Sequence, residues 1–281
     1  MLKTNRNKIP CLPLKANVAP VLEPNYNGYL TPEGTGLMMT GPGGICRNFK
    51  VGDRCSSILG WHTVPGVCLK SAGGNDGVLA YYAATGTPIK KCGGEETGYI
   101  LGACSFNASG VVAAAFPEKA ILSFDGDEMF LFYSESCGLV LEDYPEITCK
   151  IHPDLLEKLP VREENGRLLF PVAKILPEKF AGGLGGDQLA VMTSDAATAA
   201  EYDLDSLCVG DFVLFTDIDH TFGGAFLRGA ATIGIVTDSG ACHVGGGPTV
   251  SVVFSCKTDK LGGYLSDMGN IARYFEEEKT C

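Results

Sequence analysis

Short apolar runs bounded by glycine, proline or acidic turns recur along the whole chain. In the first half they predict strands at residues 45–51, 98–103, 110–116 and 128–133. In the second half, alternating or β-branched runs predict strands at residues 167–173, 212–216, 228–237 and 248–255. This pattern is typical of small sheets or barrels and not of a helical bundle.

Two segments between these strands predict short helices. Residues 75–85 begin with Asn75, a favourable N-cap, and end before Gly86. Residues 151–159 carry Pro153 in the first turn and three leucines on one helical face. Helices are therefore expected to be few and short.

Near the C-terminus, apolar side chains recur with helical spacing over residues 261–275. They are Leu261, Tyr264, Leu265, Met268, Ile271, Ala272 and Phe275. Such a stripe indicates one buried face of an amphipathic helix. The sequence therefore predicts a C-terminal amphipathic helix.

The length, the composition and the positions of the prolines predict two domains. The chain has 281 residues, 45% of them apolar, which is enough for two domains of ordinary size. Prolines crowd the first 50 residues, and the pattern changes near Pro145. We predict an N-terminal β-rich domain with a proline-rich arm at residues 1–150, and a C-terminal β-rich domain at residues 151–281. The expected fold class is α+β and β-rich, with small mixed or antiparallel sheets or barrels.

The charge distribution argues against nucleic acid as a partner. The net charge is −11, and residues 151–281 contain 10 Lys and Arg against 19 Asp and Glu. A nucleic-acid-binding surface needs a basic stripe, which the sequence lacks. The sequence also has no apolar run of membrane-spanning or signal-peptide type. We therefore expect a cytoplasmic protein with no membrane partner.

Motif spacing excludes several common sites. The 12 cysteines include no C-x-x-C pair, which excludes a zinc ribbon or a thioredoxin-type pair, so most are expected to be buried free thiols. Neither G-x-G-x-x-G nor a Gly-Lys pair occurs, which excludes the usual dinucleotide and ATP loops.

The densest polar cluster directly follows the predicted strand at residues 212–216. If that strand continues, Asp217 and Asp219 point to one face, where both carboxylates can bind one divalent metal ion. His220 lies beside them, and histidine suits a general acid or base because its pKa is near neutral. The alternative is a solvated loop in the acidic half of the chain.

Three further side chains are candidates for a site. Arg228 heads a long apolar strand, where it reaches the surface, pairs with a carboxylate or binds an anionic substrate. His62 lies beside the single tryptophan in a predicted loop, where it is either a binding residue or a packed or surface histidine. His243, like Asp238, lies in a turn near the same strands. We assign catalysis to His62 and His220, and substrate binding to Arg228 and His243.

Several stretches together indicate a family. They are MLKTN at the start, Gly43-Gly44-Ile45, Val51-Gly52-Asp53, residues 62–67, IHPDLLEKL at 151–159 and RGAATIG at 228–234. With them the chain resembles, over nearly its whole length, a bacterial family classed as a domain of unknown function. The resemblance implies two β-rich domains and assigns no catalytic residue.

The chain departs from the family pattern at two places. The resemblance implies a histidine inside a Gly-His-Gly-Pro-Gly segment, where this chain has Gly-Gly-Gly-Pro-Thr at residues 245–249. It also implies a glutamate before the first Pro-Gly, where this chain has Val64. Any metal or proton-transfer site at those positions is then incomplete here.

Two functions remain open. The first is a small-molecule enzyme, a metal-assisted hydrolase or lyase, with a divalent metal ion on Asp217 and Asp219. The second is a non-catalytic oligomeric binding or structural protein, in which the proline-rich arm packs on a neighbouring subunit. The expected partners are a small-molecule ligand and further copies of the chain.

Overall fold

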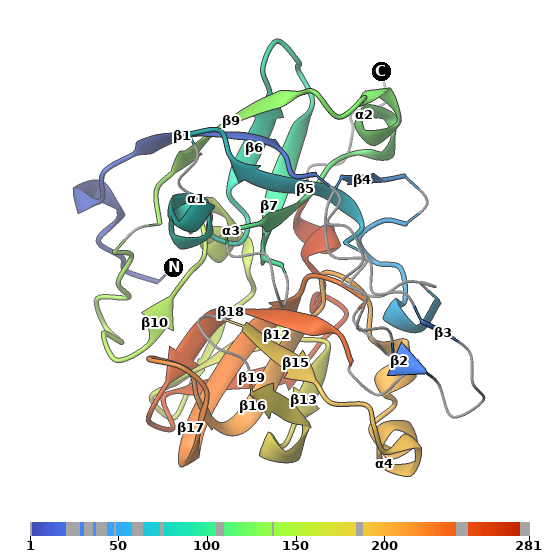
Figure 1. Cartoon of the computed structure of the whole chain (residues 1–281). Helices are drawn as coiled ribbons and strands as arrows, with labels where there is room; N and C mark the ends of the chain where they lie inside the picture. Colours follow the sequence, from blue (N-terminus) through green and yellow to red (C-terminus); the bar gives the residue numbers. More distant parts are fainter. Residues whose placement is uncertain are drawn as a thin grey trace.

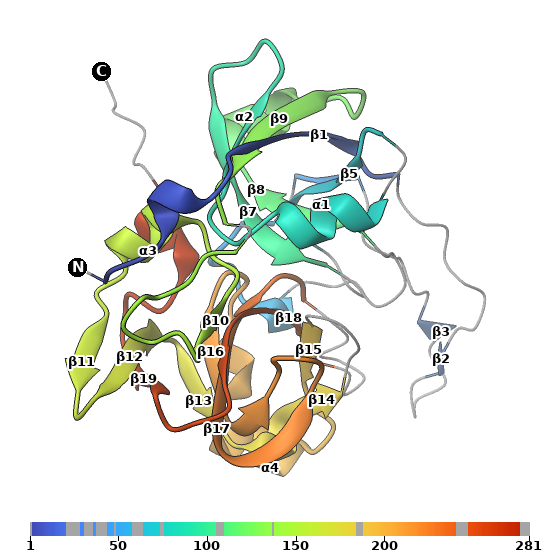
Figure 2. The ribbon, with the colours of Figure 1, turned by 90° about the vertical axis from the view of Figure 1, so that its left-hand side faces the viewer.

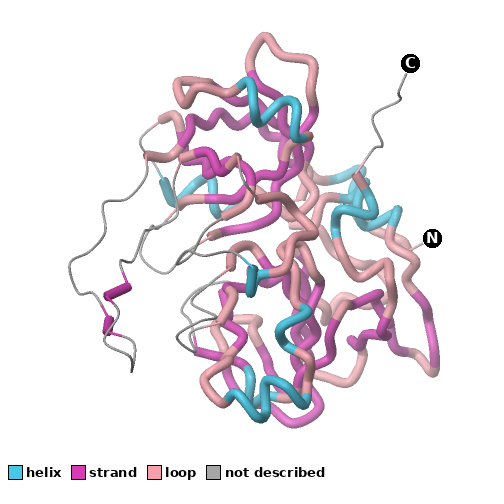
Figure 3. The backbone as a smooth tube through the Cα atoms, turned by 90° about the vertical axis from the view of Figure 1, so that its right-hand side faces the viewer, coloured by secondary structure: helices cyan, strands magenta, loops and turns pink. Residues whose placement is uncertain are grey.

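Figure 1 shows the computed structural model of the chain, in which the strands form two lobes. The structure describes residues 2–20, 29–30, 36–37, 44–47, 49–57, 64–73, 76–104, 110–136, 138–183, 188–239 and 247–275. In Figure 3 the helices are short and lie mainly around the margins of the two lobes.

The N-terminal lobe is an antiparallel barrel. Its strands follow in the order β1 (Leu12–Val18), β9 (Met129–Ser134), β6 (Pro88–Lys91), β7 (Thr97–Ala103), β8 (Val112–Ala115), β5 (Gly66–Ser71) and β4 (Ile45–Cys46). An additional pairing between β1 and β5 closes the sheet. Along β9, Phe130 and Phe132 are buried while Met129 and Tyr133 are exposed, as expected from the two-residue period of a strand.

The C-terminal lobe contains a larger mixed sheet. Its strands follow in the order β13 (Lys174–Leu176), β16 (Phe212–Asp219), β17 (Ala225–Val236), β18 (Thr249–Cys256), β15 (Gln188–Val191) and β14 (Ala181–Gly183), and β10 (Thr148–Cys149) also pairs with β18. Only the β13–β16 pair is parallel among these described strands. A three-stranded sheet joins β11 (Arg162–Glu164), β12 (Arg167–Val172) and β19 (Leu261–Leu265), and a small hairpin joins β2 (Tyr29–Leu30) and β3 (Gly36–Leu37).

The helices are minor elements. In the described residues they are α1 (Asp76–Tyr82), α2 (Glu118–Ser123), α3 (Pro153–Lys158), α4 (Ala196–Glu201) and the 3-10 turns η1 (Arg6–Lys8), η2 (Cys55–Ser57), η3 (Glu178–Phe180), η4 (Leu204–Ser206) and η6 (Ile271–Tyr274). The predicted β-rich fold class is confirmed. Within the described residues, no helix has the length and apolar character needed to cross a bilayer.

One apolar core extends across both lobes. It contains Leu101 from the barrel together with Phe254 and Ile235 from the larger sheet. The lobes meet closely at Gly102 of β7, where a Cβ atom would lie 2.5 Å from the Cβ atom of Ser251 in β18. A second core, which contains Phe130 and Phe132, fills the barrel. The barrel and the larger sheet are therefore packed as one body.

The predicted C-terminal amphipathic helix is wrong. Residues 261–265 form strand β19, which pairs in parallel with β12, and only residues 271–274 form a 3-10 turn. Cβ atoms at Gly262 and Gly263 would lie 2.7 Å from Leu169 and 3.0 Å from Val172, so both glycines permit the close strand pairing. The strand that pairs with β19 is β12, which is distant in sequence, and the helical spacing of apolar residues contains no information about that pairing.

The two shorter helix predictions are confirmed. Helix α1 lies within predicted residues 75–85, although its expected N-cap Asn75 lies outside the described residues. Helix α3 begins at Pro153 as predicted, and its N-cap is His152. In the predicted strand 45–51, only Ile45–Cys46 pairs as a strand in the described residues.

Candidate functional site

The first predicted metal ligand lies at an irregularity between β16 and β17. The pairing register shifts between Thr216 and Ile218, and Asp217 between them has a φ of +58°. Its Oδ1 atom accepts a hydrogen bond of 2.7 Å from the backbone N–H of Gly229. The strand alternation on which the metal hypothesis depends is therefore interrupted at Asp217.

The second predicted ligand closes a turn. Oδ1 of Asp219 accepts hydrogen bonds from the N–H and hydroxyl groups of Thr221, at 3.0 and 2.6 Å. Its Oδ2 atom lies 3.9 Å from the Nζ of Lys257. Next to it, His220 is buried, and its backbone N–H donates to the Oγ of Ser255 at 2.8 Å. These polar groups form local structure of the hairpin.

The other predicted site residues do not join them in the described structure. Arg228 is exposed on β17. His62 and His243 lie outside the described residues. Over the described ranges, no three or more His, Cys, Asp or Glu side chains are grouped so that they could hold a metal ion. The metal hypothesis therefore stays a prediction.

A cavity of about 450 Å³ lies between the barrel and the C-terminal segment, which comprises η6 and Phe275 (residues 271–275). Gly66 of β5 and Ala115 of β8 line one side, and Ala272 and Phe275 at the end of η6 line the other. Small-molecule sites are typically apolar hollows of about 300–1,000 Å³, often at domain interfaces. The size and position of this cavity match that class.

Charged side chains lie around these apolar walls. Lys50 and Arg47, both exposed, contribute two cationic groups. The Arg47 guanidinium donates a hydrogen bond to the carbonyl of Phe124, which fixes one of its N–H groups. Oδ2 of Asp53 accepts the backbone N–H of Lys50 at 2.9 Å, so part of this carboxylate is engaged in the turn. Glu118 at the start of α2 completes the charged lining.

A buried polar cluster lies at the interface between the lobes. Asp238 is fully buried, and its Oδ1 atom accepts the N–H of Thr249 at 3.0 Å. The Sγ of Cys55 lies 3.9 Å from the Asp238 carbonyl. Burial of a carboxylate is costly unless hydrogen bonds or charges compensate it. The cluster therefore links η2 to the segment after β17 by specific polar contacts.

Two thiols in the described residues are poor nucleophiles. A hydrogen bond with Cys68, burial and the charge of Asp238 raise the pKa of Cys104 well above its ordinary value. Burial raises the pKa of Cys149 to about 12. Because the thiolate is the reactive form, both groups stay inert at neutral pH. The nine cysteines in the described residues are free, as predicted, but only four of them are buried, and Cys11 and Cys92 are exposed.

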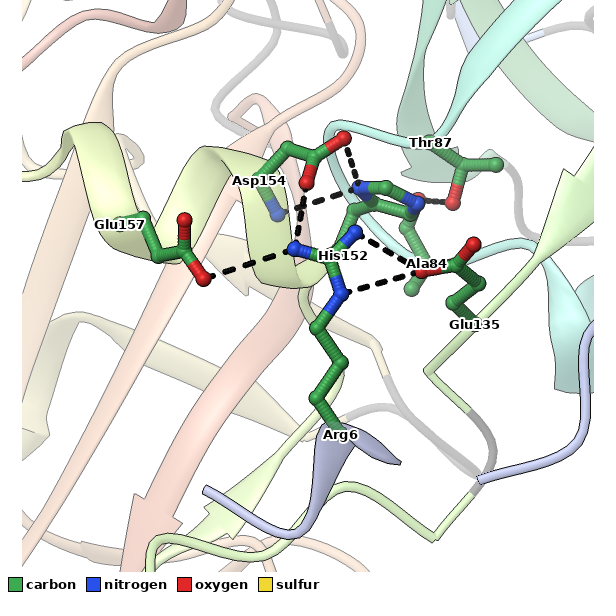
Figure 4. Close-up of polar contacts among 7 residues, drawn as sticks. All are labelled: Arg6, Ala84, Thr87, Glu135, His152, Asp154 and Glu157. Carbon is green, nitrogen blue, oxygen red and sulfur yellow. Dashed lines mark hydrogen bonds and ion pairs between the residues drawn. The ribbon is translucent and has the colours of Figure 1, made fainter. Parts of the chain in front are cut away.

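A charged cluster joins the N-terminal segment to α3 (Figure 4). The Arg6 guanidinium in η1 lies 2.9 Å from Glu135, 2.6 Å from Asp154 and 3.4 Å from Glu157. Burial alone lowers the pKa of Arg6, but the hydrogen bonds and charges of Glu135 and Asp154 raise it overall. The residues come from the two ends of the barrel sequence and from the first helix after it.

His152 lies at the centre of this cluster as the N-cap of α3. Its Nδ1 atom accepts the Asp154 N–H at 3.3 Å and lies 3.6 Å from the Asp154 carboxylate. Burial lowers its pKa, the Arg6 charge adds to that effect, and the charges of Asp154 and Glu135 oppose it. The neutral imidazole thus acts as a structural acceptor.

Sequence reasoning missed the residues around the cavity and this cluster. For the cavity, the available signal was two cations around an aromatic residue, Arg47, Phe49 and Lys50. For the cluster, it was the order His152-Pro153-Asp154, which is an N-cap followed by a favourable first helical turn. Neither signal identifies its distant partners, which only the fold brings together.

Comparisons with known proteins give one consistent answer. The N-terminal domain of DUF4438, a domain of unknown function, matches residues 29–157, and the C-terminal domain of DUF4438 matches residues 158–275. The crystal structure of a protein named TM1086 is similar with a TM-score of 0.84 and 26% sequence identity, over 98% of this chain and 99% of that chain. No curated protein matches. The resemblance seen in the sequence is confirmed, and the chain belongs to the DUF4438 family.

Proposed function

We propose that this protein binds a small molecule with an apolar body and an anionic group in the cavity between the barrel and the C-terminal segment. The observation that carries the proposal is a ligand-sized cavity with apolar walls and two exposed cations, Arg47 and Lys50. Two carboxylates, Asp53 and Glu118, also line it, and Asp53 accepts the backbone N–H of Lys50. Burial of the apolar body supplies the affinity, and the cations select the anionic end.

Binding is favoured over catalysis by the chemistry of the lining. Among the described lining residues, Cys46 carries the only thiol, none carries a side-chain hydroxyl, and no histidine is present to activate a nucleophile. Nucleophilic catalysis requires an activating base or a lowered pKa. The lining of the cavity therefore supports ligand binding. Pro65 and Gly66 also line the cavity. They directly follow Val64, the position at which this chain departs from the glutamate of the family pattern.

The proposal can be tested with matched pairs of ligands. Aliphatic and aromatic carboxylates and phosphates would be titrated against the neutral amide or alcohol with the same apolar body, with the melting temperature as readout. A bound ligand stabilises the folded state by mass action. We expect the anionic ligands to raise the melting temperature more than the neutral ligands. The substitution Lys50→Gln is expected to reduce that difference.

Two controls make the test specific to the cavity. Ala272 is exposed and lines the cavity, so Ala272→Trp is expected to obstruct it without disturbing the core. Ala197→Trp, at an exposed position of α4, is the matched control. Lys15→Gln, at an exposed position of β1, controls for the loss of one positive charge. Equal ligand responses in Ala272→Trp and Ala197→Trp would contradict the proposal.

A further inference from the structure

Large apolar side chains are exposed together at one end of the molecule. They lie at the end of the β16–β17 ribbon, where Phe222 is 89% exposed, Phe226 64% and Leu227 39%. In Figures 1 and 2 strand β17 lies in the lobe opposite the barrel. Phe226 and Leu227 are successive residues of β17, so their side chains lie on opposite faces of the ribbon, and both faces of this end carry an exposed apolar group. Large exposed apolar groups gathered in one element of a soluble protein favour an interaction site.

The backbone next to these side chains has an open edge. Strand β17 pairs with β16 as far as Ala225, but its pairing with β18 begins only at Ala231. In the described structure, no strand pairs with the other edge of residues 225–230, and residues 225–229 are all exposed. Unpaired strand edges can accept a further chain.

Positive and negative side chains are balanced at the ribbon, whereas the whole chain is acidic. The chain has a net charge of −11. The ribbon and its neighbour combine the carboxylates of Asp217 and Asp219 with the cations of Arg228 and Lys257, and the Nζ of Lys257 lies 4.9 Å from the centre of the Phe222 ring. Two copies of an acidic chain repel each other over most of their surfaces. They meet with least repulsion where the charge is balanced and the surface is apolar.

We propose that two copies of this chain associate through a ribbon patch formed by Phe222, Phe226, Leu227 and Arg228. A two-fold axis presents the same patch from both copies, which is the commonest symmetry of soluble oligomers. Each Arg228 then faces the aromatic rings and carboxylates of the other copy's ribbon, the groups that attract a guanidinium. The apolar side chains are buried at the centre of the contact and are no longer exposed to water.

The test measures the mass of the full chain by sedimentation equilibrium over a range of concentrations. We expect the unmodified protein to form dimers. Phe226→Ser is expected to raise the dissociation constant by about tenfold or more, as for an aromatic residue at the centre of an interface. Arg228→Glu is expected to weaken the dimer as well, because it makes the patch acidic, and added salt is expected to restore part of that loss.

Tyr81→Ser is the matched control, because Tyr81 is 81% exposed on α1, far from the ribbon in sequence and in the other lobe. This variant should keep the dimer, and circular dichroism should show that all variants are folded. A monomeric unmodified protein would overturn the proposal, and co-sedimentation with neutral phosphatidylcholine vesicles that Phe226→Ser abolishes would assign the patch to a lipid surface instead. Equal dissociation constants for Phe226→Ser and Tyr81→Ser would also overturn it.

Discussion

At the scale of single residues, His152 shows how burial controls a titratable group. The imidazole is buried, and its pKa lies below the ordinary value because burial disfavours the charged form. Arg6, Asp154 and Glu135 are the charged groups that face it. Protonation of His152 would cost the N-cap acceptor that Nδ1 provides to α3.

The lowered pKa predicts a pH dependence of stability. As the pH falls below about 6.5, the unfolded chain binds a proton at this histidine before the folded chain does, so the free energy of unfolding decreases. The decrease continues until the pH reaches the folded-state pKa. His152→Asn keeps an N-cap acceptor but cannot titrate, so it should lose less stability between pH 7.5 and 5.5. Urea unfolding at both pH values measures this, and an equal loss in both proteins would show that His152 is not responsible.

A second residue-scale prediction concerns Gly66 on the cavity wall. Its φ is +112°, and a Cβ atom would lie 2.3 Å from the carbonyl oxygen of Ala114. Gly126 has a similar φ of +108°, but nothing lies within 4 Å of its Cβ position. Both substitutions to alanine should cost backbone strain of about 1–3 kcal/mol, and Gly66→Ala should cost more because of the added clash. Denaturant unfolding compares them, and equal losses would rule out the close contact.

Between elements, the Arg6 cluster ties η1 to α3 and to the segment after β9. One guanidinium contacts three carboxylates, those of Glu135, Asp154 and Glu157. Arg6→Ala leaves these three acidic groups close together without their cation. We expect a loss of about 1.5–3 kcal/mol, the range for hydrogen bonds to charged groups.

The matched control for this prediction is Lys3→Ala. Lys3 lies 3.6 Å from Asp143, and both side chains are mostly exposed. Exposed ion pairs contribute only about 0–1 kcal/mol. Chemical unfolding at low and high salt should show a larger effect for Arg6→Ala, and salt should remove a larger share of the small Lys3→Ala effect because that pair is the more exposed. A similar loss in both variants would mean that the cluster contributes no more than an isolated surface pair.

For the whole molecule, the shared core predicts cooperative unfolding. Leu101 of the barrel packs in the same apolar core as Phe254 and Ile235 of the larger sheet. Domains with such an interface lose it when either one unfolds. We therefore expect far-UV and near-UV circular dichroism to report one coincident transition in urea. Two separated transitions would contradict this.

The interface itself can be weakened at Gly102. A Cβ atom there would lie 2.5 Å from the Cβ atom of Ser251 in the other lobe, whereas at Gly73 the nearest atom is 3.9 Å away. Gly102→Ala should lower the midpoint of both spectroscopic signals together, and Gly73→Ala should leave the midpoint almost unchanged. A shift confined to one signal would show that the lobes unfold independently.

The predicted strands and helix α3 depend on local information, and there the sequence was informative. Alternation along β9 and the proline at the start of α3 act within a few residues of one another. The apolar stripe at residues 261–275 failed because its true partner, β12, is remote in the chain. Asp217 and Asp219 were expected to follow the regular alternation of a strand. A register shift between β16 and β17 interrupts that alternation at Asp217, and this shift depends on how the two strands pair.

By itself, the sequence determined a β-rich chain with short helices and a family membership, because turns, strand periodicity and family motifs are read from near neighbours. Only the tertiary structure decided that Arg47 and Lys50 share a cavity with Phe275, that Arg6 reaches α3, and that one core spans both lobes. Those contacts join segments that are more than 100 residues apart in the chain. Their formation depends on the packing of whole sheets, which no local pattern specifies.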